Sequence, residues 1–152
     1  MSTSDPDRGV SAMLTYFGGS FFLHLLWENL QAPLYAGYIS FSQHFLMCFK
    51  ATATGDMLFM LLIYLVLATV HQDLFWADKR QVYEHPVTWT LTAIIGGLQG
   101  ISCEYWALTS HRWQYDAMPL LPILHVGIFP VLQMIFVPTL TLLICSQFVS
   151  QS

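Results

Sequence analysis

The stretch AMLTYFGGSFFLHLLWENLQAPLY, residues 12–35, decides what kind of protein this chain forms. Its only charged residue is Glu28, close to the end of the stretch. A helix needs about 20 predominantly apolar residues to cross the hydrocarbon core of a bilayer. The stretch therefore predicts a membrane-spanning helix that gathers its polar residues, His24, Glu28 and Gln31, towards one end.

The composition of the whole chain favours lipid over water as its surroundings. Hydrophobic residues make up 55% of the 152 residues and charged residues 9%, against roughly 25% charged in soluble domains. A soluble all-helical domain of this composition would have too little polar surface to face water. We therefore expect an all-α, polytopic membrane protein that forms one domain, 1–152. Its four transmembrane helices would form an up-down bundle, with spans at about 10–30, 51–71, 87–108 and 120–148.

The charges exclude one class of partner and indicate an orientation. The net charge is −4 and no basic cluster occurs, so no nucleic acid is expected as a partner. An even number of spans places both termini on one side of the membrane. That side would hold Arg8, Lys79 and Arg80, and the other side Lys50 and Arg112. By the positive-inside bias, the termini are predicted to be cytoplasmic.

The unusual polar residues fall where an up-down bundle brings helix ends together, so we expect a polar cluster at one membrane face. On the first helix, Ser20, His24, Glu28 and Gln31 lie on one stripe. An ionisable side chain costs about 2.5–3.5 kcal/mol at the bilayer centre and normally faces the bundle interior. The functional interpretation is a buried acid–base pair of His24 and Glu28. The alternative is a polar helix end that binds headgroups or water.

The second and third spans each add one carboxylate. The segment KATATGD places Asp56 near the start of its helix, where it would serve in catalysis or only stabilise the helix dipole. The segment GGLQGISCEYWAL places Gly96, Gly100 and Glu104 on one face by their spacing of four. Small residues at this spacing let membrane helices pack closely. The third helix would thus combine a packing face with a candidate acid.

The last loop and the last span supply the remaining candidates. Arg112 is expected to neutralise one of the three carboxylates, and Trp113 and Tyr115 are expected at the membrane interface. His125 and Gln133 are separated by eight residues and would share a face of the fourth helix. A hydrogen-bonded structural histidine is the alternative to a ligand-binding one. Three prolines recur every eight residues and should kink this helix: Pro122, Pro130 and Pro138.

No cofactor is predicted, and no metal ligand is assigned. The three cysteines have neither metal-type nor disulfide-framework spacing, so we expect buried free thiols, with a pair between Cys48 and Cys103 as the alternative. The side chains of types that suit iron, zinc or haem are His24, Glu28, Glu104 and His125. Their spacing matches no diagnostic pattern, and a bound metal or haem stays an open alternative.

Three segments together resemble a family of small prokaryotic integral membrane proteins that has no established activity. They are LWENLQAPLY, KATATGD and EYWALTSHRWQYDAMPLLPILHVGIFPVLQMIFVP. The shared pattern is Trp-Glu with a following Gln-x-Pro-Leu-Tyr, then Gly-Asp, Glu, Arg-Trp-x-Tyr, Met-Pro and Pro-x-x-Gln. The resemblance covers nearly the whole chain and implies a four-helix protein of the inner (plasma) membrane. It singles out Trp27, Glu28, Asp56, Glu104, Arg112, Trp113, Tyr115, Met118, Pro119 and Gln133.

The chain is more distantly similar to the emopamil-binding family of sterol isomerases and related lipid-binding membrane proteins. That family also has four core helices and carries His-x-x-x-Glu in the first, as His24 and Glu28 do here. The segment KATATGD matches its Lys-Gly-Asp element only loosely. Its third-helix aspartate has no clear match, since Glu104 is at best an analogue. The similarity therefore does not imply sterol isomerisation.

Three functions fit these features, and we favour the first. In it, the bundle binds or transforms a lipid-like or other small hydrophobic molecule. The acid–base residues would be Glu28, Glu104, His24 and Asp56, and the ligand-binding residues Arg112, Trp113, Tyr115, Trp27, Gln31, His125 and Gln133. The second function is a non-catalytic accessory subunit of a larger membrane complex, and a homo-oligomer is also open. The third is a proton or ion path, against which stands the collection of polar residues at one end.

Overall fold

The computed structural model describes residues 6–151, so the first five residues and the last one of the predicted domain 1–152 lie outside the description. Within this range the chain is helical and forms no strand, which confirms the predicted all-α class. The elements in chain order are α1 (Pro6–Gln31), η1 (Ala32–Leu34), α2 (Phe41–Ala51), η2 (Thr52–Asp56), α3 (Met57–Val70), η3 (Trp76–Asp78), α4 (Arg80–Glu84), α5 (Pro86–Thr109) and α6 (Ile128–Gln151).

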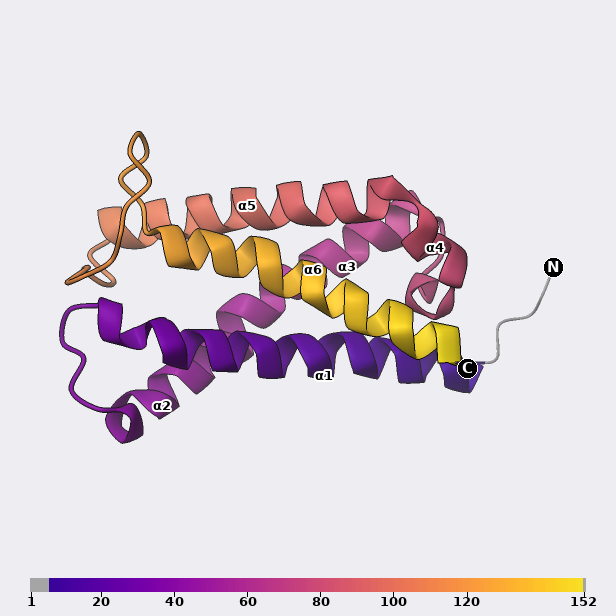
Figure 1. Ribbon diagram of the computed structural model, residues 1–152, viewed down its shortest axis with the longest axis horizontal. Helices are drawn as coiled ribbons and strands as arrows, with labels where there is room; N and C mark the ends of the chain where they lie inside the picture. The colour runs from indigo at the N-terminus through magenta and orange to yellow at the C-terminus, as the bar shows by residue number, and fades with distance from the viewer. Residues whose placement is uncertain (1–5, 152) are drawn as a thin grey trace.

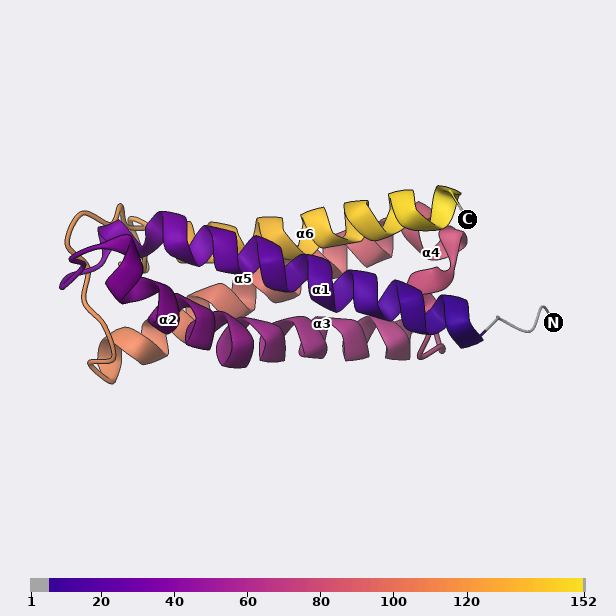
Figure 2. The ribbon, with the colours of Figure 1, turned by 90° about the horizontal axis from the view of Figure 1, so that it is seen from below.

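The long helices run back and forth along a common axis (Figures 1 and 2). Helix α1 leads away from the end where the described chain begins, α2 and α3 return as one continuous helix, α5 leads away again and α6 returns. Both ends of the described chain therefore lie at the same end of the molecule. We call the opposite end the distal end. It is formed by the end of α1, the start of α2, the end of α5 and the start of α6.

Three helices are long and apolar enough to cross a membrane: Asp7–Leu34, Phe41–Val70 and Ile128–Ser150. The sequence predicts four such spans, and α5 is the exception among the described helices. Its 24 residues are sufficient in length, but threonines, glycines, Gln99 and Glu104 make it more polar. The outward faces carry exposed apolar side chains, such as Leu14, Phe22 and Leu58 at 69%, 71% and 62% exposure. Surfaces of this kind fit lipid better than water.

The second membrane-length helix begins ten residues before the predicted span, at Phe41. Ser40 stands at its N-cap, but the Ser40 side chain makes no capping hydrogen bond. The helix widens into a π-turn over Thr52–Asp56, where the N–H of Met57 donates to the carbonyl of Thr52, five residues earlier. π-turns inside α-helices often mark functional sites, and this one ends at Asp56.

The last helix begins at Ile128, and the prediction that helix extends back to about residue 120 is wrong. Residues 119–128 form a small hairpin, in which Leu121 N–H donates to Val126 O at 2.8 Å and Ile128 N–H to Pro119 O at 2.8 Å. Pro122 lies in this hairpin and disfavours a helical conformation for the residue before it. Pro130 lies in the first turn of α6, where proline is tolerated. Only Pro138 is inside the helix, so the predicted three kinks are not there.

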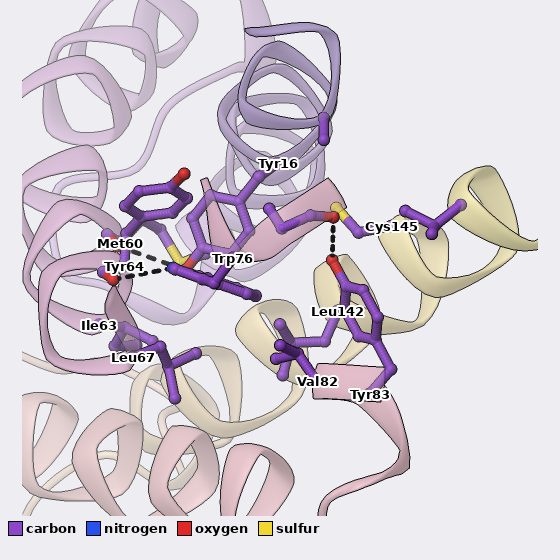
Figure 3. Packing of buried hydrophobic residues seen from close by; sticks show 13 residues of the cluster. Tyr16, Met60, Ile63, Tyr64, Leu67, Trp76, Val82, Tyr83, Leu142 and Cys145 are labelled. Carbon is purple, nitrogen blue, oxygen red and sulfur yellow. Dashed lines mark hydrogen bonds between the residues drawn. The ribbon is translucent and has the colours of Figure 1, made fainter. Parts of the chain in front are cut away.

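Near the chain termini, aromatic rings fill the bundle and seal it (Figure 3). Tyr16, Tyr64 and Trp76 are almost completely buried, and their rings pack edge to face or tilted at centroid distances of 5.1–5.7 Å. Their polar atoms find backbone partners, since Tyr16 Oη donates to Met60 O and Trp76 Nε1 to Tyr64 O. This half of the molecule is a well-packed core, which leaves the distal half as the place for a site.

Helices α5 and α6 touch through the predicted glycine face. A Cβ added at Gly96 would lie 1.8 Å from Met134 O, and one at Gly100 would lie 3.0 Å from Val131 Cα. The two backbones can approach this closely only because these residues have no side chain. Glu104, one turn further along the same stripe, is buried at 3% exposure. The expectation that the packing face and the carboxylate belong together is confirmed.

We predict that Gly96→Ala destabilises the protein by about 1–3 kcal/mol, because the methyl group must push α5 away from α6. The measurement is the temperature at which the buried thiols of Cys48 and Cys145 become reactive to a maleimide dye in mild detergent. Gly18→Ala in α1 is the matched control, since nothing lies within 4 Å of its added Cβ. Alanine there should leave the temperature unchanged or raise it slightly. Equal temperatures for the two variants would contradict the close contact.

Candidate functional site

Polar side chains from α1, η2 and α6 meet around the amide of Gln133, which is 2% exposed. Its Oε1 accepts a hydrogen bond from Gln31 Nε2 at 2.8 Å. Its Nε2 lies 3.0 Å from His24 Nδ1 and 3.4 Å from Asp56 Oδ2. One amide thus joins three helical segments, and the contact with Gln31 fixes which of its two polar atoms faces His24.

The same network extends along α1 to the first carboxylate. Gln31 Nε2 also donates to Glu28 Oε1 at 3.1 Å, and Trp27 Nε1 donates to Gln31 Oε1 at 3.2 Å. His24, Gln31 and Glu28 of the predicted stripe are therefore joined in one network, in which Gln133 of α6 links His24 to Gln31. It faces the bundle interior, because His24 and Gln31 are buried at 0% and 4% exposure.

His24 carries an unused polar atom in a fully buried position. Its Nδ1 accepts from the Gln133 amide and lies 3.6 Å from Asp56 Oδ2. In the neutral ring the proton then lies on Nε2, which has no hydrogen-bond partner among the described residues. Asp56 Oδ2 lies beyond hydrogen-bond distance of Nδ1, so the Gln133 amide joins the two side chains by contacting both of them.

Glu104, on α5, is bound from the loop that precedes α6. Tyr115 Oη donates to Glu104 Oε2 and accepts the N–H of Gly127 at 2.7 Å. Burial, followed by the hydrogen bond to Glu104, raises the pKa of Tyr115. Burial and the nearby carboxylates of Glu104 and Glu28 also raise the pKa of Tyr35. Both phenols therefore keep their protons, and Tyr115 donates to the carboxylate.

These groups surround a cavity of about 550 Å³ in the distal half of the bundle. Glu28, Asp56 and Glu104 line it, together with apolar and aromatic side chains. Among the described residues of its wall, Arg112 is the one permanent cation, and it is exposed. The complete wall comprises Glu28, Gln31, Ala32, Tyr35, Ala36, His44, Met47, Cys48, Ala51, Thr54, Gly55, Asp56, Phe59, Gly100, Cys103, Glu104, Trp106, Arg112, Trp113, Pro130, Gln133 and Met134.

The wall of the cavity is closed on one side and open on another. Its residues on α6 and at the end of α1, such as Gln133 and Gln31, are buried. Met47 on α2 and Trp106 on α5 are 64% and 52% exposed. Helix α2 packs against α1, whereas its continuation α3 packs against α5, and α2 and α5 stand apart at the distal end (Figure 1). The mouth of the cavity therefore lies between α2 and α5, on a face lined by apolar side chains.

Ten of the eleven predicted site residues lie in the cavity wall or bond directly to it. Glu28, Asp56, Glu104, Gln31, Gln133, Arg112 and Trp113 line the cavity, while His24, Trp27 and Tyr115 bond to wall residues. His125 is the exception. It is exposed, has a positive φ of 54° and lies in the hairpin before α6, so it shares no helix face with Gln133.

The expected partner of Arg112 is also wrong. Among the described residues, no ion pair joins its guanidinium to Glu28, Asp56 or Glu104. It lies over the ring of Trp106 instead, with Cζ 5.4 Å from the ring centroid. A cation held on an aromatic face at the rim stays in contact with water. The three carboxyl groups therefore rely on neutral donors, which are the amides of Gln31 and Gln133 and the phenol of Tyr115.

Most of the other wall residues are apolar, but Tyr35, Cys48 and Cys103 carry polar groups and were not among the predicted site residues. Tyr35 is the tyrosine of the quoted Pro-Leu-Tyr pattern. Its backbone is joined to the last loop, since Ala36 N–H donates to Gln114 O at 2.9 Å. This pairing of two loops across the distal end brings Tyr35 beside Glu104, and no local sequence signal announces it.

In the described part of the chain, no three His, Cys, Asp or Glu side chains are grouped as a metal site requires. All three cysteines are free thiols. Comparison with family models, with curated proteins and with solved structures finds no match to this chain.

We predict that Gln133→Met destabilises the protein by about 1–3 kcal/mol. Methionine keeps the size of the side chain but removes the buried hydrogen bonds that this amide makes with Gln31, His24 and Asp56. The thiol-reactivity temperature in mild detergent measures the effect. Gln147→Met, at an exposed position of the same helix, is the control and should leave that temperature unchanged. If the Gln133 side chain contributed only packing, Gln133→Met and Gln147→Met would have the same thiol-reactivity temperature.

Proposed function

We propose that this protein is an integral membrane protein that binds or transforms a lipid-like or other small hydrophobic molecule in its distal cavity. The observation that carries the proposal is the meeting of three carboxyl groups from three helices, those of Glu28, Asp56 and Glu104, around one largely apolar cavity. In a membrane, such groups are expensive and are usually kept for function. We place α5 as a fourth crossing, since it lies in the bundle beside α6.

The wall of the cavity selects for the chemistry of the ligand. Apolar and aromatic side chains line most of it and suit a hydrocarbon body. The deep polar groups are carboxylates and amides, and Arg112 is held at the rim. Hydroxyl or amino groups would find acceptors there, whereas a phosphate would meet like charge. The favoured ligand is therefore an amphiphile whose polar group donates hydrogen bonds.

Acid–base work is assigned to two groups of residues on opposite sides of the cavity. His24 and Asp56 both accept hydrogen bonds from the Gln133 amide, and Gln133 and Gln31 link them to Glu28. Glu104 has its own donor in Tyr115. Buried carboxyl groups that have neutral hydrogen-bond donors beside them suit general acid or base catalysis. Arg112 and Trp113, at the rim, would hold the outer part of the ligand.

Two features support entry of the ligand from the bilayer. The mouth lies between α2 and α5, and the Met47 and Trp106 side chains there are exposed on a membrane-length part of the molecule. With the termini on the cytoplasmic side, as the positive-inside bias predicts, the distal end would lie at the outer face of a prokaryotic inner membrane.

The proposal is tested with Glu28→Gln and Glu104→Gln in protein reconstituted in vesicles. The probe is a long-chain alcohol that carries a photoreactive diazirine. Each substitution removes a charged hydrogen-bond acceptor, so labelling of cavity peptides should fall by at least about tenfold. Glu84→Gln, at an exposed position of α4, is the matched control and should label like the native protein. The corresponding long-chain phosphate should compete poorly with the alcohol.

Other outcomes distinguish the alternatives. Full labelling of both variants would contradict the role of the carboxylates. A large loss of thermal stability in both would make Glu28 and Glu104 structural. If the native protein purifies in mild detergent with stoichiometric partner chains and takes up no probe, it is an accessory subunit.

We also predict that Ala51→Trp blocks loading of the same probe, because an indole at this exposed wall position fills the mouth between α2 and α5. Ala53→Trp is the control. Ala53 is exposed two residues further along and is not part of the cavity wall, so its variant should label normally. Normal labelling of Ala51→Trp would place the entry elsewhere.

A further inference from the structure

The hairpin formed by residues 119–128 presents apolar side chains outside the bundle. Ile123 is 90% exposed, and Leu120 and Leu124 are 41% and 47% exposed. The segment from Met118 to Gly127 contains no Asp, Glu, Lys or Arg. Burying one such side chain is worth about 1.5–3 kcal/mol, so a row of them in water would be unusual.

The hairpin has a fixed shape. Backbone hydrogen bonds close it at Leu121 to Val126 and at Ile128 to Pro119, both at 2.8 Å. Met118 and Val126 anchor its base, with exposures of 6% and 1%. The apolar tip is therefore held outward by a defined backbone rather than left exposed by a loose loop.

The position of the hairpin indicates what it touches. It leads directly into α6, which is apolar enough to cross a membrane from Ile128 onwards. It projects sideways from the distal end, across the axis of the bundle (Figure 1). If the bundle axis is the membrane normal, the tip reaches over the lipid beside the protein, at the level where the helices leave the bilayer.

The neighbouring loop gives the contrast. Residues Ser110, His111, Arg112 and Asp116 are exposed and polar, as a water-facing turn should be. One loop connects α5 to α6, yet its first half is polar and its second half apolar. Two environments at the same end of the molecule explain the difference.

We propose that the hairpin is a membrane-interface anchor, whose tip at Ile123 and Leu124 inserts among lipid headgroups and upper acyl chains. It is joined to the site through one residue, because Gly127 N–H donates to Tyr115 Oη and Tyr115 donates to Glu104. The lipid contact thereby fixes the position of the donor to this carboxylate. The anchor does not depend on what the cavity binds.

The test introduces a photoreactive residue into the otherwise native chain, as Ile123→p-benzoylphenylalanine. The purified variant is reconstituted in vesicles of phosphatidylcholine with some phosphatidylglycerol, irradiated and analysed by mass spectrometry. Covalent adducts with phospholipid are expected. Ser110→p-benzoylphenylalanine is the control at the same end, and it should give several-fold fewer lipid adducts.

Each other result overturns the proposal. Crosslinks between two copies of the chain would make the hairpin a self-association surface. Equal lipid adducts at both positions, or none at either, would show that the tip has no special contact with the interface. Leu124→p-benzoylphenylalanine, on the same tip, repeats the measurement if the first variant does not fold, and it must give the same pattern of adducts.

Discussion

The burial of polar side chains among apolar ones is the constraint on which the distal half of this protein depends. A buried carboxyl, amide or imidazole group must find its partners within the protein. Here the Gln133 amide supplies partners to Gln31, His24 and Asp56 at once, so helices that contribute one polar residue each are held in a single register. The aromatic core near the termini could tolerate small shifts between helices. The distal network could not, because each shift would leave a buried polar atom without a hydrogen bond.

The same constraint accounts for the division of the molecule into two halves. In the half near the termini, the rings of Tyr16, Tyr64 and Trp76 fill the space between the helices. The polar atom of each of these side chains donates to a backbone carbonyl, so none of the three is available to a ligand. At the distal end, the long helix of α2 and α3 tilts away from α5, and the polar residues line the space that opens. Close contact of α5 with α6 through Gly96 and Gly100 holds the opposite wall in place. The cavity therefore opens on one side only, because α5 and α6 are held together while α2 tilts away from α5.

Patterns local to one helix predicted much of this arrangement. The spacing of His24, Glu28 and Gln31, and that of Gly96, Gly100 and Glu104, is a property of helical geometry and needs no knowledge of neighbours. The errors lie where the chain leaves a regular helix. Proline spacing predicted a kinked helix around Pro122, but the chain forms a hairpin there and carries His125 away from the site. Arg112 was assigned by charge alone, whereas the structure places it over Trp106. Tyr35 reached the site through loop pairing across the molecule, which no spacing encodes.

The π-turn at Thr52–Asp56 has a consequence for the whole second helix. Cys48, Thr52, Asp56 and Met60 are all buried, although steps of four drift by about 40° each in a regular α-helix. The π-turn has more residues per turn than an α-helix, so it offsets part of this drift and keeps the four side chains close to one face. A chain one residue shorter there would wind evenly and rotate everything beyond by about 100°. Either Asp56 or the row of Met60, Ile63 and Leu67 would then face lipid. The five residues of the π-turn thus determine both that Asp56 faces the cavity and that the apolar row of α3 faces the core.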